Sequence, residues 1–140
     1  MSTEQVSLAS LMTPSKTVSV DFADYEGAKI DLCYLSREEM VKLRKASIST
    51  KYNKKTHQPE EQLDENKFMK TYCKAVIKGW SGFKYDFVQE LVLIDLGDIN
   101  PQDEMAFNED NAFILMKNSE FFDSWVTETA MDLGNFTGDK

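Results

Sequence analysis

The sequence has a single histidine, two cysteines and no long apolar run. One histidine excludes a metal site built from several histidines, and a catalytic triad would depend on His57, which lies in a polar stretch. Cys33 and Cys73 lack CxxC spacing and are too few for a disulfide framework, so we expect buried thiols. Runs of large apolar side chains such as 91–94 and 113–116 are four residues long, far short of the roughly 20 that span a bilayer. We therefore expect no membrane partner.

Signatures of nucleotide binding and hydrolysis are also missing. The chain contains no P-loop, GxGxxG, HExxH or GxSxG. Paired carboxylates stand at 38–39, 60–61 and 109–110, each where we expect a helix to begin, and acidic side chains there interact favourably with the helix dipole. The sequence predicts no enzyme: no catalytic residue, no cofactor and no metal. The start of the chain does not resemble a secretory signal, which favours a cytoplasmic protein.

The net charge is −8, and it is unevenly distributed. Residues 42–57 contain six Lys or Arg and no acid, whereas residues 85–139 contain thirteen Asp or Glu and one lysine. This acidic balance argues against a nucleic-acid partner, because nucleic acids are themselves negatively charged. The basic stretch is either a helix end running into a solvated loop or a patch that pairs with an acidic surface of another copy or a partner. The residues assigned to self-association are Lys51, Lys54 and Lys55.

The predicted fold class is α+β, mostly α-helical, with an N-terminal β-hairpin packed on a bundle of about four helices. Residues 1–16 are expected to be a flexible N-terminal arm, 17–136 a single domain and 137–140 a flexible C-terminal tail. Apolar and polar residues alternate over 18–22 and 30–34, with Gly27 in the turn between them, which is typical of a hairpin with one buried face.

The first two helices are expected to follow this hairpin. Ser36 opens a capping box, with Glu39 three residues later, and the helix should run over 37–47. After a polar insert, the second helix is expected over 59–78. Its apolar side chains recur at three- and four-residue steps, so we expect it to be the central core helix.

The second half of the chain is less regular. Two glycines flank Trp80 and are expected to end the second helix and let the tryptophan fold back on the core. Residues 84–106 contain an apolar run that fits either a short buried strand or a helical turn. A capped helix is expected to start within 107–112. Ser119 should be the N-cap of a last helix, which is expected to end in a glycine cap at Gly134.

The ordered combination of these segments resembles the tail assembly chaperones of long-tailed (siphovirus-type) bacteriophages. The segments are LSREEMVKLRK, then IKGWSGF, then FNEDNAFILMKNSEFFDSWVTETAMDLGNF. In that family a Trp-Gly-type motif follows a long helix, and a Phe-x-x-Glu-Asn step opens a turn before an aromatic-rich last helix. The corresponding positions here are Trp80, Gly82, Phe107, Asn111, Leu115, Met116, Lys117, Asn118, Ser119, Phe122 and Trp125. The resemblance covers residues 17–136.

The resemblance implies an interaction protein that acts in the host bacterial cytoplasm before the virion is complete. Members of the family bind the tape measure protein, a very long and largely helical chain, and keep it soluble. They help the tail tube protein to polymerise around it, and they are absent from the mature virion. Many are also made in a longer form by ribosomal frameshifting. Together with the opposed basic and acidic segments, the resemblance implies a homo-oligomer in rings or short spirals.

A chaperone for an amphipathic helix needs an adaptable apolar surface, and methionine and aromatic side chains provide one. The chain has seven methionines and sixteen aromatic residues, which either fill the core or also form such a surface. Phe121 and Phe122 are adjacent and cannot both face one core from a helix, so Phe121 is the better candidate for an exposed contact. The candidate partner-binding residues are Phe121, Trp125, Met116, Trp80 and Phe83.

Two other functions fit the same residues. A virion structural or tail-completion protein would share the small size and the self-association, but it would remain in the particle. A small regulatory module could instead bind nucleic acid through residues 42–55, and its affinity would then fall steeply with salt.

Overall fold

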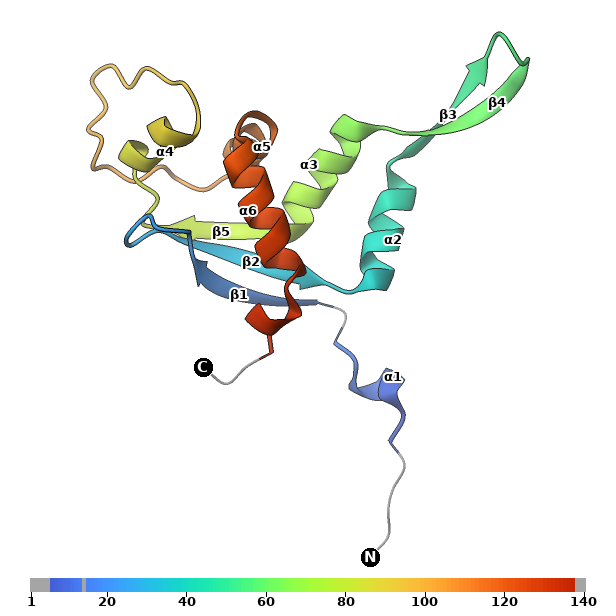
Figure 1. Ribbon diagram of the computed structural model, residues 1–140, viewed down its shortest axis with the longest axis horizontal. Coiled ribbons are helices and arrows are strands. Elements are labelled where there is room, and N and C mark those ends of the chain that lie inside the picture. Colours follow the sequence, from blue (N-terminus) through green and yellow to red (C-terminus); the bar gives the residue numbers. More distant parts are fainter. Residues whose placement is uncertain (1–5, 14, 138–140) are drawn as a thin grey trace, which may run out of the picture.

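The computed structural model describes residues 6–13 and 15–137 (Figure 1). Six α-helices and five strands occur within this part of the chain, followed by a short 3-10 helix, Leu133–Asn135. The elements in order are α1 (Leu8–Leu11), β1 (Ser15–Asp21), β2 (Lys29–Leu35), α2 (Arg37–Ala46), β3 (Ile48–Asn53), β4 (Gln58–Leu63), α3 (Glu65–Val76), β5 (Ile77–Ser81), α4 (Tyr85–Leu91), α5 (Glu109–Asn118) and α6 (Glu120–Met131).

The first strand of the main sheet begins before the expected start of the domain. β1 starts at Ser15, two residues before the expected start of the domain at position 17. Residues 1–5 and 14 of the expected arm, and residues 138–140 of the expected tail, lie outside the described residues. None of the helices in the described part of the chain is both long enough and apolar enough to span a membrane.

The main sheet has three antiparallel strands in the order β1-β2-β5. The predicted hairpin of β1 and β2 is confirmed, and Gly27 adopts a φ of +87° in the connection, where a side chain would be strained. β5 departs from the prediction, which places a helix through Lys78. Instead, α3 ends at Val76 and the next residue is extended, so that Ile30 of β2 pairs with Trp80 of β5.

A second, two-stranded sheet consists of β3 and β4. It occupies the segment expected to be a polar insert, and residues 59–61, expected to start a helix, lie in β4. The turn is held by the side-chain oxygen of Asn53, which accepts hydrogen bonds from the backbone N–H groups of Lys55 and Thr56. Figure 1 shows this hairpin projecting from the body of the molecule beyond the ends of α2 and α3.

Three of the predicted helix starts are confirmed. The side-chain oxygen of Ser36 accepts a hydrogen bond from the N–H of Glu39, and that of Ser119 accepts one from the N–H of Phe122, as in other N-caps. Asn108 caps α5 in the same way. The predicted end of α6 is wrong, because the helix stops at Met131 and Gly134 lies in the following 3-10 helix rather than in a glycine-ended cap.

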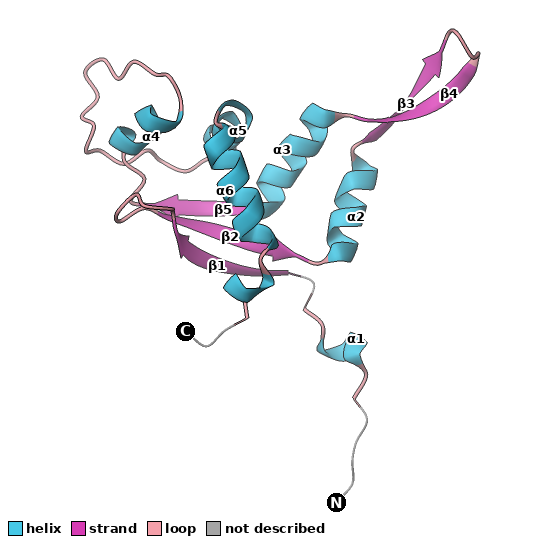
Figure 2. Cartoon of the chain, in the orientation of Figure 1, coloured by secondary structure: helices cyan, strands magenta, loops and turns pink. Residues whose placement is uncertain are grey.

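The core lies between the three-stranded sheet and the helices above it. In Figure 2 α3, α5 and α6 gather over one side of this sheet, and α3 and α6 both contact β2. The largest fully buried side chains come from both layers and include Phe22, Phe83 and Phe122. The fold is therefore α+β, but the predicted hairpin on a bundle of about four helices is wrong, because the helices pack on a sheet. Only 44% of the described residues are helical, and 25% lie in strands.

Segment 84–106, for which the sequence fits either a short buried strand or a helical turn, contains one short helix and a long loop. It begins with α4 and continues as an irregular loop, in which Leu93 is fully exposed. The loop returns to the body where the N–H of Met105 donates to the carbonyl oxygen of Phe83, at 2.8 Å. The indole N–H of Trp80 donates to the carbonyl oxygen of Met105, also at 2.8 Å, so Trp80 anchors the loop to the sheet.

Candidate functional site

A cluster of partly exposed aromatic side chains lies where the β1–β2 turn, α4 and α6 meet. It consists of Tyr25, Phe87, Phe121 and Trp125, and we call it the aromatic patch. The ring of Tyr25 lies 5.2 Å from that of Phe87 and 6.4 Å from that of Phe121, between ring centroids. These distances are those of interacting aromatic pairs, so the rings form one surface.

The buried ring of Phe22 supports the aromatic patch from below. Its centroid lies 4.8 Å from Trp125, 5.0 Å from Tyr25 and 6.2 Å from Phe121. Phe121 and Trp125 are four residues apart and therefore share one side of α6. Phe121 is 50% exposed, whereas its neighbour Phe122 is fully buried. The prediction that Phe121 is the exposed member of the pair is confirmed.

Two glycines bring the separate parts of the aromatic patch together. Gly82 follows β5 with a φ of +65°, and a Cβ atom at this position would overlap the carbonyl oxygen of Gly27. This backbone contact places the turn that carries Tyr25 against the start of the segment that leads to Phe87. Glycine is the residue that allows both the positive φ and the close approach.

Carboxylates lie beside the aromatic patch. Partial burial raises the pKa of the Tyr25 phenol, and the negative charges of Glu90 and Asp24 raise it further. On the side of α4, the ammonium group of Lys84 lies 6.0 Å from the ring centroid of Phe87, within the range of a cation–π contact. The patch is thus an apolar surface with acidic groups close to Tyr25 and a lysine close to Phe87.

The other predicted partner-binding residues take different positions. Phe83 is fully buried and Met116 is 3% exposed, so both are core residues and are covered in this conformation. Trp80 is half-buried and contacts Phe83 in a tilted geometry and Phe107 edge-on, at centroid distances of 5.0 and 4.9 Å. Of the five candidates, only Phe121 and Trp125 belong to the aromatic patch. Tyr25 and Phe87, which complete it, were not predicted.

The three lysines assigned to self-association lie together on the projecting hairpin. Lys51 is in β3, and Lys54 and Lys55 are in the turn; all three are exposed. Neither of the two ion pairs found among residues 6–13 and 15–137 involves them. We call these three residues the basic turn. Their charges are available to an acidic surface.

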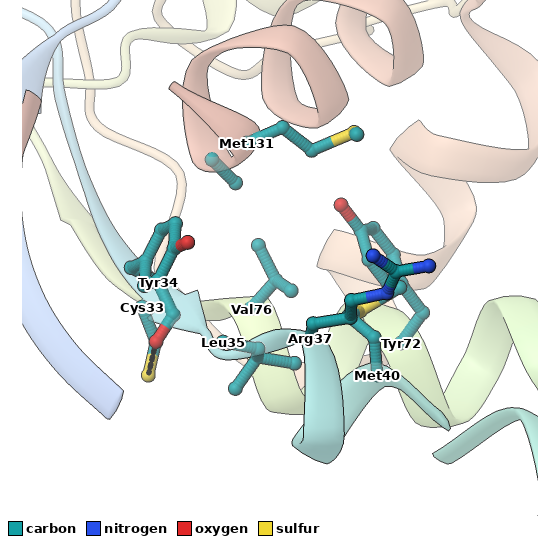
Figure 3. Close-up of a pocket in the computed structure, with 9 residues that line it drawn as sticks. Cys33, Tyr34, Leu35, Arg37, Met40, Tyr72, Val76 and Met131 are labelled. Carbon is teal, nitrogen blue, oxygen red and sulfur yellow. Dashed lines mark hydrogen bonds between the residues drawn. The ribbon is translucent and has the colours of Figure 1, made fainter. Parts of the chain in front are cut away.

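An apolar groove opens on another side of the molecule, between the end of β2, the start of α2 and the ends of α3 and α6. Its volume is about 310 Å³. In Figure 3 Tyr34 lies on one side of the groove, Arg37, Met40 and Tyr72 on the other, and Met131 at the rim. The remaining lining residues are Cys33, Leu35, Val76 and Ala130.

The thiol of Cys73 lies in the core rather than on these surfaces. Burial raises the pKa of the Cys73 thiol to about 12, so the thiolate that a nucleophile requires is disfavoured. Within the described residues, no group of three or more His, Cys, Asp or Glu side chains could hold a metal ion. What the surfaces offer is apolar area and charge, which are the means of binding another macromolecule.

Comparison with models of known protein families, with curated proteins and with solved structures finds no match to this chain. The residues and the surfaces that they form are therefore the basis for assigning a function.

Proposed function

We propose that this chain is a tail assembly chaperone of a long-tailed bacteriophage. In the host cytoplasm it binds the tape measure protein, keeps it soluble, promotes assembly of the tail tube protein around it and is absent from the mature virion. The ordered motifs of the sequence support this proposal. The observation that carries it is the aromatic patch, which holds the half-exposed ring of Phe121 at the surface beside Trp125.

The aromatic patch suits an amphipathic helix. A long helical chain without its partners exposes an apolar stripe, and such stripes are recognised by apolar surfaces that take side chains at helical spacing. Rigid aromatic rings supply contact area at a low entropic cost. Glu90 and Asp24 lie near Tyr25 and Lys84 lies beside Phe87, so a bound helix can place charged side chains of either sign beside its apolar stripe.

The contribution of Phe121 to binding follows from its exposure. Complete burial of a phenylalanine stabilises by roughly 1.5–3 kcal/mol, and half of this side chain is still exposed. Burial of the exposed half is worth half of that amount, so truncation to alanine should cost about 0.8–1.5 kcal/mol of binding free energy, which is a loss of about three- to thirteen-fold in affinity.

Co-expression with the tape measure protein tests the proposal. The wild-type chain should hold the tape measure protein in the soluble fraction and should co-purify with it through an affinity tag. Phe121→Ala should lower the soluble yield, whereas Ile114→Ala, an equally exposed apolar residue on α5, should not. A tape measure protein that stays insoluble beside the wild-type chain would contradict the function, and equal yields from the two variants would exclude the patch as the site.

Mass spectrometry separates this role from that of a virion component. The chain should be abundant in infected cells and missing from purified particles; its presence in the particles would favour a structural or tail-completion protein. The same spectra test whether a longer form made by ribosomal frameshifting accompanies it, since such a form would yield peptides that extend past Lys140.

The proposal includes self-association through unlike charges. Figure 1 places the β3–β4 hairpin with its basic turn at one end of the molecule and the loop between α4 and α5 at the other. That loop carries exposed acidic side chains, namely Asp95, Asp98, Asp103 and Glu104. A head-to-tail contact between the two ends of successive copies would generate rings or open spirals.

A further inference from the structure

The N-terminal segment Val6–Met12, here called the apolar arm, displays large apolar side chains that the rest of the chain leaves uncovered. Val6, Leu8, Leu11 and Met12 are between 59% and 72% exposed. Leu8 and Leu11 are three residues apart and lie on one side of the single helical turn, and Met12 follows directly after it. The segment has no charged residue. It is therefore a short amphipathic element without a surface to pack on.

The short helix within the apolar arm cannot be stable by itself. α1 is four residues long, and none of its residues is buried. Isolated helices need on the order of 12–15 residues to be even marginally stable in water, and shorter ones depend on packing. A surface that receives Leu8 and Leu11 would supply that packing.

The apolar groove has the chemistry and the position to receive such a segment. Arg37 is the one charged residue among those that line it, and Met40 and Met131 can adapt their side chains to an incoming one. Leu35, which lines the groove, pairs with Ser15 at the start of β1. The apolar arm thus leaves the body close to the groove.

We infer that the apolar arm of one copy of this chain docks into the apolar groove of a second copy. Met12 has an extended backbone, with φ −69° and ψ 136°, and Figure 1 shows the arm running away from the body of its own molecule. Every copy carries both a projecting arm and an open groove, so the two features are complementary between copies. The docking is a helix-in-groove contact, with Leu8 and Leu11 as the anchors.

This interface differs from the contact between the basic turn and the acidic loop, and it does not depend on binding to the tape measure protein. An apolar contact keeps its strength as salt is added, whereas a contact between exposed charges weakens. The two contacts can therefore be distinguished by the salt dependence of self-association. Loss of tape measure binding would leave the docking of the apolar arm unaffected.

Disulfide trapping between two differently tagged chains tests the docking directly. One chain carries Leu11→Cys and the other Met131→Cys, and both carry Cys33→Ala, so that the native groove thiol cannot react. Under mild oxidation the mixture should give a cross-linked heterodimer. Replacing the Met131→Cys partner with one that carries Ile114→Cys, exposed on α5, should give little product.

Two results would overturn the inference. An internal disulfide in a chain carrying both Leu11→Cys and Met131→Cys, without any heterodimer, would mean that the arm fills its own groove. No disulfide in either experiment would mean that the groove takes a different occupant.

Sedimentation velocity supplies an independent test with variants that leave the core untouched. Leu8→Ser with Leu11→Ser should weaken self-association by at least about tenfold at both low and high salt. Val41→Ser, which removes an exposed apolar side chain of α2 outside the groove, should leave it unchanged. Unaltered association of the double variant would contradict the inference.

Discussion

Replacing Gly82 with alanine should have two effects at once: it should destabilise the protein, and it should disrupt the aromatic patch. The new methyl group would overlap the carbonyl oxygen of Gly27, and the backbone φ of +65° disfavours any side chain. The N–H of Gly82 also donates to the carboxylate of Glu104 at 2.9 Å, so a shift of the backbone here disturbs the attachment of the loop after α4.

The matched control is Gly97→Ala. Gly97 has a similar φ of +57°, but a Cβ atom there would meet nothing within 4 Å. The left-handed backbone costs alanine roughly 1–2 kcal/mol, part of which is offset by the lower entropy of the unfolded chain, so Gly97→Ala should lower the free energy of unfolding by about 1 kcal/mol. Overpacking adds about 1–3 kcal/mol at Gly82, for a total of about 2–4 kcal/mol.

Thermal and urea unfolding followed by circular dichroism measure this difference. A gap of about 2 kcal/mol between the variants corresponds to roughly 8 °C in Tm for a chain of this size. Binding of the tape measure protein should fall in Gly82→Ala but not in Gly97→Ala, because only the first displaces Tyr25 relative to Phe87. Equal stabilities of the two variants would refute the close contact between Gly82 and Gly27.

Three further results are expected. Because the folded-state pKa of Cys73 is raised to about 12 from 9.0, the unfolded chain loses the proton first, and the free energy of unfolding should fall by roughly 2–3 kcal/mol between pH 9 and 11. Urea titrations should show a flatter pH dependence in Cys73→Ala; an unchanged slope would contradict this. Trp80→Phe removes the indole N–H that donates to the carbonyl oxygen of Met105, which should lower the free energy of unfolding by about 1–2 kcal/mol. Hydrogen exchange at the Met105 amide should become faster, because the loop is then held less firmly. Unchanged exchange would argue against Trp80 as the anchor of the loop. Replacing the three lysines of the basic turn with glutamate should reduce self-association about tenfold at low salt and little at high salt. The same replacement at three exposed lysines of α3, namely Lys67, Lys70 and Lys74, should not have this effect. Equal effects of the two replacements would mean that only the net charge of the protein matters.

The parts of the fold that local sequence determines were predictable. The β1–β2 hairpin follows from alternating side chains and Gly27, and the starts of α2 and α6 follow from Ser36 and Ser119. Each of these features is decided within a few residues by turn or capping chemistry. Local sequence predicts structure in this chain where near neighbours along the chain supply the hydrogen bonds.

The errors occur where a distant partner decides the structure. The predicted helix includes residues 77 and 78, yet residues 77–81 form β5 because β2 offers an open edge. Gly79 pairs with Asp31 of β2, and the absence of a side chain leaves room for the Asp31 carboxylate, which would lie 2.9 Å from a Cβ atom there. Residues 58–63 look like a helix start, with proline and two acids, and become β4 by pairing with β3. Neither partner is visible in the local pattern.

The residues of the aromatic patch likewise divide into those that local sequence predicts and those that it does not. Phe121 could be identified as exposed because it is adjacent to Phe122 and one helix cannot bury both. Tyr25 and Phe87 could not be added to it, because they come from a turn and a helix about a hundred and about thirty-four residues earlier in the chain. Their place beside Phe121 depends on the backbone contact between Gly27 and Gly82.

Photo-crosslinking is the most direct test of the claim that the aromatic patch binds the tape measure protein. Benzoyl-phenylalanine is introduced at position 121, or at position 114 on α5 as the control, in a chain co-expressed with the tape measure protein. We predict that irradiation cross-links the position 121 variant to the tape measure protein and leaves the position 114 variant free. A soluble complex in which position 121 does not cross-link, or does so no better than position 114, would contradict the account.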